Sequence, residues 1–168
     1  MTEWFEALRW SRPDIAAGEY WRLLTGHLVH LDAGHALMNA LGAVVVWTVF
    51  RRDLPWQVWA WVAAGAVLGV DLGLWFGTDF DWYVGASGVL HAFAAAGILQ
   101  SLWMGTLLPW IVAALGIAKL IYEQIFGAIS WGPGSSAVVT EAHLFGALAG
   151  VLVVLIWRAM RLTPVVDD

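Results

Sequence analysis

The feature that most constrains this chain is a succession of five apolar stretches, each close to the length of a membrane-crossing helix. A perpendicular helix needs about 20 residues to cross the hydrocarbon core of a bilayer. The stretches cover residues 35–50, 54–76, 87–103, 107–126 and 142–159. The chain is also 61% hydrophobic and only 12% charged, which separates it from average soluble domains. These patterns predict an all-α, polytopic membrane helix bundle.

The length of 168 residues suits a single membrane domain. We divide it into an N-terminal and outer-loop segment (1–34), a helical core (35–159) and a tail (160–168). The chain has no cysteine, which excludes disulfides, thiolate metal sites and cysteine nucleophiles. No basic run suggests a nucleic-acid partner.

Arginines predict how the bundle is oriented. Two pairs lie at the ends of the first and last stretches: Arg51 with Arg52, and Arg158 with Arg161. Cytoplasmic loops are enriched in Lys and Arg, so both pairs are expected in the cytoplasm. The starts of the third and fifth stretches then lie at the outer face. Three N-terminal arginines oppose this bias: Arg9, Arg12 and Arg22.

A serine between small residues opens the third stretch, in the run Gly85-Ala86-Ser87-Gly88. Flanking glycines allow a sharp backbone turn and the close approach of a second helix. The serine hydroxyl is a candidate nucleophile, although a free hydroxyl is weak and needs a neighbouring base. The alternative is a serine that merely packs between helices or bonds a nearby carbonyl, which is common in membrane helices.

His143 opens the fifth stretch and is the candidate base for Ser87. Gly146 and Gly150 follow it with a four-residue spacing that clears one helix face for close packing. Ser87 and Gly88 offer a matching small surface, so packing of these two helices would bring the imidazole to the hydroxyl. The alternative is a structural histidine that hydrogen-bonds across helices.

His35 and Asn39 lie one helical turn apart in the first stretch, so they share a face. Both side chains can donate hydrogen bonds. Fixed donors near a nucleophile stabilise a developing oxyanion, and loss of one costs about 100- to 1000-fold in rate. An ordinary polar contact between helices is the alternative interpretation.

The remaining histidines admit other roles. His91 follows Ser87 by one turn, so it either supports His143 or competes with it as the base. A histidine metal cluster is a weaker hypothesis, because the spacing matches no strong zinc pattern and no HExxH motif is present. The histidines concerned are His27, His30 and His35.

Ionisable residues also occur inside the apolar stretches. Lys119 and Glu123 are one turn apart, and we interpret them as a buried pair of opposite charges. Asp71 lies late in the second stretch. A proton path through Asp71, Glu123 and the histidines would suggest a small proton-coupled transporter.

The connection over residues 127–140 is long and rich in glycine. It lies at the end of the bundle where Ser87 and His143 are expected. We interpret it as a candidate mobile lid, with a passive connector as the alternative.

Together these runs resemble those of the rhomboid intramembrane serine proteases. The resemblance covers about residues 18–161. Four motifs carry it in order: Glu19-Tyr20-Trp21-Arg22, His35-Ala36-Leu37-Met38-Asn39, Gly85-Ala86-Ser87-Gly88 and Ala142-His143-Leu144-Phe145-Gly146-Ala147-Leu148-Ala149-Gly150. Within the family the chain is most similar to the rhombosortase branch, in the runs 18–30, 87–91 and 119–124.

The resemblance implies a six-helix core in which a serine and a histidine act without an acidic third member. It implies Ser87 as nucleophile and His143 as general base, with neither a metal nor another cofactor. The oxyanion site would comprise His35, Asn39 and the backbone N–H of Ser87. Residues in supporting positions would be His91, Gly85, Gly88 and Gly146.

The rhombosortase branch also implies a substrate and a location. The expected partners are membrane lipids and the C-terminal transmembrane segment of secreted proteins, which carries a Gly-Gly-type sorting signal. Transfer of the new C-terminus to an amine acceptor and a homo-oligomeric state are both open options. The expected location is the bacterial inner membrane, with the site opening to the periplasm. The alternatives are an inactive rhomboid-like protein that binds transmembrane helices, and the proton-coupled transporter.

Two features depart from the family pattern. Five spans are visible where six are expected, because residues 1–17 are too short and polar to cross a bilayer. We expect residues 1–17 on the outer side. In other rhomboids a tyrosine that packs against the catalytic imidazole is common at the position of His91.

Overall fold

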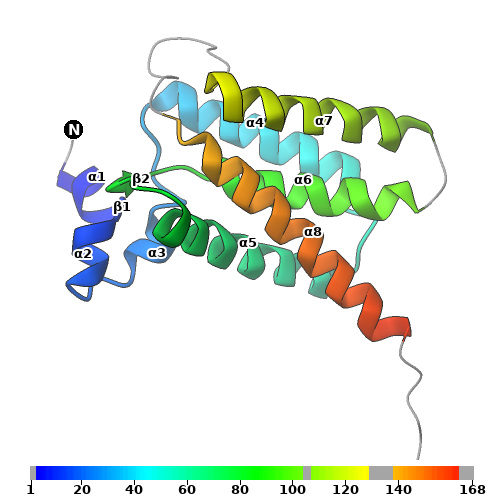
Figure 1. The fold of residues 1–168 in the computed structure, drawn as a ribbon, viewed down its shortest axis with the longest axis horizontal. Helices are drawn as coiled ribbons and strands as arrows, with labels where there is room; N and C mark the ends of the chain where they lie inside the picture. Colours follow the sequence, from blue (N-terminus) through cyan, green and yellow to red (C-terminus); the bar gives the residue numbers. More distant parts are fainter. Residues whose placement is uncertain (1–2, 104–106, 129–137, 163–168) are drawn as a thin grey trace, which may run out of the picture.

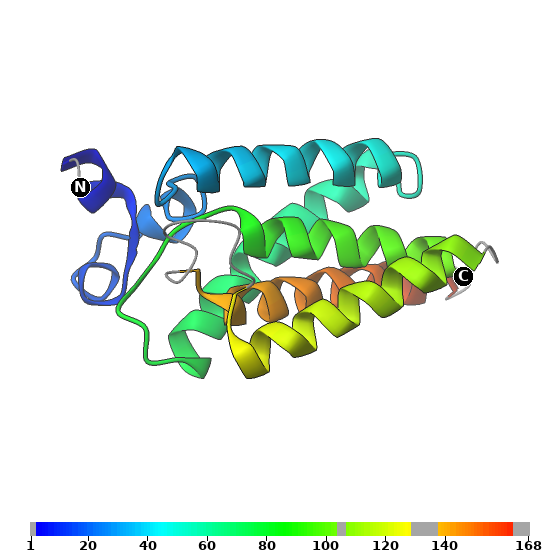
Figure 2. The ribbon, with the colours of Figure 1, turned by 90° about the horizontal axis from the view of Figure 1, so that it is seen from above.

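The computed structural model describes residues 3–103, 107–128 and 138–162. Its core is a bundle of long helices, which confirms the predicted all-α membrane fold (Figure 1). These helices are α4 (Ala33–Phe50), α5 (Trp56–Gly77), α6 (Ser87–Leu102), α7 (Leu107–Phe126) and α8 (Thr140–Leu162). Viewed from above, α6 lies between α4 and α7 (Figure 2). Each helix begins and ends within a few residues of the apolar stretch that predicted it.

Helix length separates α6 from its neighbours. Four described helices are long and apolar enough to cross a membrane: α4, α5, Pro109–Phe126 of α7 and Thr140–Arg161 of α8. The 16 residues of α6 span only about 24 Å, against about 30 Å of hydrocarbon. On its own, α6 is therefore too short to cross the hydrocarbon perpendicular to the bilayer.

Short elements cover one end of the bundle. They are α1 (Glu3–Leu8), β1 (Trp10–Ser11), α2 (Arg12–Ala16) and α3 (Arg22–Thr25). β1 pairs antiparallel with β2 (Trp82–Tyr83), which lies in the connection between α5 and α6. This pairing ties the N-terminal segment to the end where α4, α6 and α8 begin (Figure 1). The sequence did not predict the pairing, because two residues are too few to show the alternation of a strand.

The N-terminal arginines have structural partners. The guanidinium of Arg12 caps the C-terminal end of α5, where helix carbonyls lack partners. It donates to the carbonyl oxygens of Leu74, Trp75, Thr78 and Phe80. Arg22 is buried and forms ion pairs with Asp14 and Glu19. These two arginines are therefore bound within the fold and are not free loop charges.

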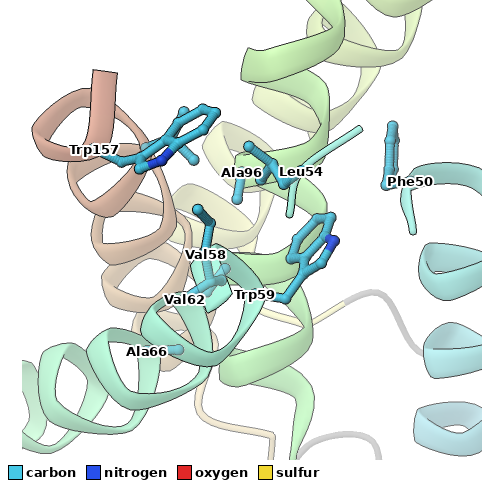
Figure 3. Close-up of a cluster of buried hydrophobic side chains, with 10 residues drawn as sticks. Phe50, Leu54, Val58, Trp59, Val62, Ala66, Ala96 and Trp157 are labelled. Carbon is cyan, nitrogen blue, oxygen red and sulfur yellow. The ribbon is translucent and has the colours of Figure 1, made fainter. Parts of the chain in front are cut away.

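A hydrophobic core fixes α5, α6 and α8 at the other end of the bundle (Figure 3). Val58 and Val62 of α5 are almost completely buried, and Trp157 of α8 lies in the same cluster. Phe50, at the end of α4, covers Gly97 of α6 so closely that a Cβ there would collide with its ring.

Candidate active site

The first turns of α6 and α8 approach with no room for side chains between them. A Cβ on Gly146 would collide with the carbonyl oxygen of Gly88, and one on Gly150 with that of Ala92. A Cβ on Gly88 would lie 2.8 Å from the carbonyl oxygen of Ala142. The close packing predicted from the glycine spacing is therefore observed. It brings the backbone before His143 directly against the residue that follows Ser87.

Ser87 and His143 are hydrogen-bonded across this contact. The distance between Ser87 Oγ and His143 Nε2 is 2.9 Å. Ser87 is the first residue of α6, while His143 lies in the first turn of α8 and is 5% exposed. A hydroxyl donating to an unprotonated ring nitrogen is the arrangement in which a base can activate a weak nucleophile.

A carboxylate lies on the other side of the His143 ring. Glu123 Oε2 is 2.9 Å from His143 Nδ1, and Lys119 Nζ donates to the same oxygen at 2.6 Å. The predicted pair of Lys119 and Glu123 is therefore present. The contact between Glu123 and His143 was not predicted, because the family resemblance implied no acid at this place.

His91 packs beneath His143 and uses both ring nitrogens elsewhere. Its Nδ1 lies 2.7 Å from the carbonyl oxygen of Ser87, and its Nε2 lies 2.9 Å from Lys119 Nζ. His91 therefore supports His143 by ring contact, and the hydrogen-bond partner of His143 Nδ1 is Glu123.

The candidate oxyanion donors differ in availability. The ring of His35 lies against Gly85, where a Cβ would be 2.7 Å from His35 Cε1. His35 Nε2 is buried and has no hydrogen-bond partner among the described residues. Asn39 is also buried, but its Nδ2 donates to the carbonyl oxygen of His35 at 3.0 Å. His35 therefore offers a free nitrogen beside the site, whereas Asn39 has one N–H group engaged in its own helix.

The turn that presents Ser87 is held by two contacts on Gly85. This glycine has a φ of +119°, which side-chain-bearing residues rarely adopt. Its N–H donates to the carbonyl oxygen of Gly26 at 2.9 Å, and its own carbonyl accepts from the Tyr83 hydroxyl at 2.5 Å. Burial raises the pKa of Tyr83, so its hydroxyl stays protonated and acts as a donor. Sequence reasoning did not single out Tyr83.

The N-terminal histidines have other neighbours. His27 Nε2 lies 3.2 Å from Asp71 Oδ1, and both side chains are buried. The rings of His30 and His35 make an edge contact, with 5.2 Å between their centroids. Asp71 is thus paired locally, beside the turn that carries Tyr83, whose ring contacts His27.

Among the described residues, the side chains close enough to share a metal ion are His91, Glu123 and His143. Their donor atoms lie within 4.8 Å of one another. The ammonium of Lys119 is hydrogen-bonded to two of the three, His91 and Glu123. The Lys119 ammonium therefore already occupies the position of a cation beside His91 and Glu123.

The sequence identified only part of the site. It proposed Ser87, His143, His35, Asn39 and His91, and the structure gathers Ser87, His143 and His91 directly. It interpreted Glu123 as structural, although a charged pair within an apolar helix was a usable signal of a functional position. The candidate lid lies largely outside the described residues.

The Rhomboid domain family matches residues 17–160 of this chain. The "Putative rhomboid protease YdcA" of Bacillus subtilis (strain 168) is 25% identical over 150 residues, which make up 89% of this chain and 73% of that protein. No solved structure matches the chain significantly.

Proposed function

The chain belongs to the rhomboid family of membrane proteases, and from this we propose that it is an intramembrane serine endopeptidase with Ser87 as nucleophile and His143 as general base. The observation that carries the proposal is the 2.9 Å contact between Ser87 Oγ and His143 Nε2. It joins two residues that are 56 positions apart in the sequence, at the shared end of α6 and α8.

The reaction follows from this contact. Ser87 Oγ bonds to the carbonyl carbon of the scissile peptide while its proton moves to His143 Nε2. His143 then gives that proton to the leaving amine as the peptide bond breaks, which leaves an acyl group on Ser87. Water, or an amine in a transfer reaction, attacks the acyl group and releases Ser87.

The negative charge that develops on the substrate oxygen needs donors. We assign this role to the backbone N–H of Ser87, to His35 and to Asn39. His35 supports the assignment best, because its Nε2 is buried beside Gly85 without a partner among the described residues. Preorganised donors of this kind supply a large part of the rate in acyl transfer.

We further propose that the substrates are secreted proteins with a C-terminal Gly-Gly-type signal followed by a transmembrane segment. The similarity to the rhombosortase branch in the runs 18–30, 87–91 and 119–124 supports this substrate class. Glycines at the cleavage site would suit a nucleophile that sits in a narrow contact between two helices. The proposed location is the bacterial inner membrane, with the site facing the periplasm.

A serine-directed fluorophosphonate probe tests the nucleophile in detergent and in liposomes. We expect labelling of the wild type and none of Ser87→Ala or His143→Ala. The same three proteins are given a membrane-anchored substrate with a C-terminal Gly-Gly signal, and thermal melting checks their folding. Near-normal cleavage by either folded variant overturns the dyad. A wild type that binds this substrate without cutting it favours the inactive, helix-binding alternative.

Mass spectrometry of the released product distinguishes hydrolysis from transfer. A free carboxylate at the new C-terminus indicates hydrolysis, whereas the added mass of an amine indicates transfer. If a membrane substrate without the Gly-Gly signal is cleaved as fast as one that carries it, the proposed substrate class is contradicted.

A further inference from the structure

Hydrogen bonds around the site form a closed ring that begins and ends at Ser87. From Ser87 Oγ it passes through His143 to Glu123, where His143 Nδ1 lies 2.9 Å from Glu123 Oε2. Lys119 bonds to that same oxygen and to His91 Nε2, and His91 Nδ1 returns to the carbonyl oxygen of Ser87. Three helices, α6, α7 and α8, contribute to the ring.

The chemistry of the partners assigns the protons. An ammonium only donates and a carboxylate only accepts. His91 Nε2 therefore accepts from Lys119, so its Nδ1 carries the proton that is donated to the Ser87 carbonyl. In the same way, His143 Nδ1 carries a proton for Glu123, which leaves Nε2 free to accept from the Ser87 hydroxyl. Glu123 thus selects the tautomer that a general base requires.

The Glu123 carboxylate is buried, so its charge acts strongly on its neighbours. The Glu123 side chain is 4% exposed and that of His143 is 6% exposed, whereas Lys119 is 38% exposed. A buried charge without a partner is strongly destabilising. Lys119 compensates Glu123 while His143 is neutral, and Glu123 faces the positive charge that appears on His143 when it takes the serine proton.

We propose that Glu123 is a positioning residue for His143, so that the site works as a Ser87–His143–Glu123 triad held by Lys119. The proposal rests on the proposed function of Ser87 and His143. It goes beyond that function by adding an acid where the family resemblance implied none.

The decisive variant is Glu123→Gln, which keeps the shape of the side chain and removes its charge. An amide at this place can present N–H to His143 Nδ1 and so favours the wrong tautomer. We expect kcat to fall by up to about 10,000-fold with little change in KM, because a triad carboxylate that becomes an amide costs about that much. Glu123→Asp keeps the charge and should recover about tenfold or more of that loss.

Glu141→Gln is the matched control, because Glu141 is a nearby carboxylate of α8 that bonds Thr140 rather than His143. It should keep kcat within about threefold of the wild type. Absence of Ser87-dependent cleavage in the wild type would refute the proposed function and the triad together. If the wild type shows Ser87-dependent cleavage and folded Glu123→Gln cleaves within about threefold of its rate, the triad alone is refuted.

A measurement on the unaltered protein covers the case in which Glu123→Gln does not fold. Nitrogen-15 NMR of labelled histidines reports which ring nitrogen carries the proton, and the His143 signal is assigned by its loss in His143→Ala. We expect His143 to be protonated at Nδ1 and unprotonated at Nε2 near neutral pH. The opposite tautomer would overturn the proposal whatever the variants show.

Discussion

The imidazole rings of His91 and His143 are stacked, with 4.2 Å between their centroids and 14° between their planes. His91 is fixed from both edges, by the Ser87 carbonyl and by Lys119. The His91 ring is therefore held in a stack against the His143 ring, with no hydrogen bond between the two. This stack restricts the orientation of the His143 imidazole, which must align with Ser87. The flat aromatic shape of residue 91 therefore matters more than the proton it carries.

His91→Tyr should retain activity within about tenfold, because a phenol keeps the aromatic stack and its oxygen can accept from Lys119. His91→Ala should cleave more slowly than His91→Tyr but faster than Ser87→Ala, since it removes the ring stacked on His143 and leaves the base in place. Initial rates for the three variants and the wild type, measured on one substrate, check the order. If His91→Tyr is as inactive as Ser87→Ala while His143→Ala still cleaves, the base is His91.

The sequence predicted those parts of the molecule that depend on local pattern. Long apolar runs gave the helices, and the spacing of Gly146 and Gly150 gave the contact of α8 with α6. The place of Glu123 beside His143 depends instead on how α7 is rotated about its axis. The charged pair of Lys119 and Glu123 indicates which face of α7 points into the bundle, but not which side chain of α8 that face meets. The capping of α5 by Arg12 joins segments more than 60 residues apart, which no local pattern reveals.

The two side chains proposed as oxyanion donors should differ in strength. His35→Ala should lower kcat about 100- to 1000-fold with little change in KM, because its Nε2 is free beside Gly85. Asn39→Ala should have a smaller effect, since one N–H of its amide already serves the helix. Met38→Ala is the control, as an exposed position on the same helix. A rise in KM alone would indicate that His35 binds substrate rather than stabilising the transition state.

The contact between α6 and α8 should tolerate no added methyl group. Gly146→Ala places a Cβ against the backbone carbonyl of Gly88, which cannot move aside as a side chain can. We expect a loss of about 1–3 kcal/mol of stability and a larger loss of kcat, because the helices must separate where Ser87 meets His143. The same substitution at Gly116 of α7 is the matched control, since a Cβ there meets nothing within 4 Å. Gly116→Ala should leave the melting temperature unchanged or raise it slightly. Equal melting temperatures and rates for the two variants would contradict the close packing.

The orientation of the bundle can be tested with single cysteines, because the chain contains none of its own. The arginines at the Ser87 end are bound by carbonyls and carboxylates, whereas Arg51 and Arg52 at the other end are exposed. Exposed loop arginines are the ones that favour the cytoplasm, so this end should face inward and the Ser87 end outward. Ala7→Cys lies in exposed α1, at the Ser87 end, and should react with a membrane-impermeant maleimide on intact spheroplasts. Arg52→Cys should react only after the membrane is opened. The reverse pattern would place Ser87 and His143 toward the cytoplasm and would exclude secreted proteins that have already crossed the membrane as substrates.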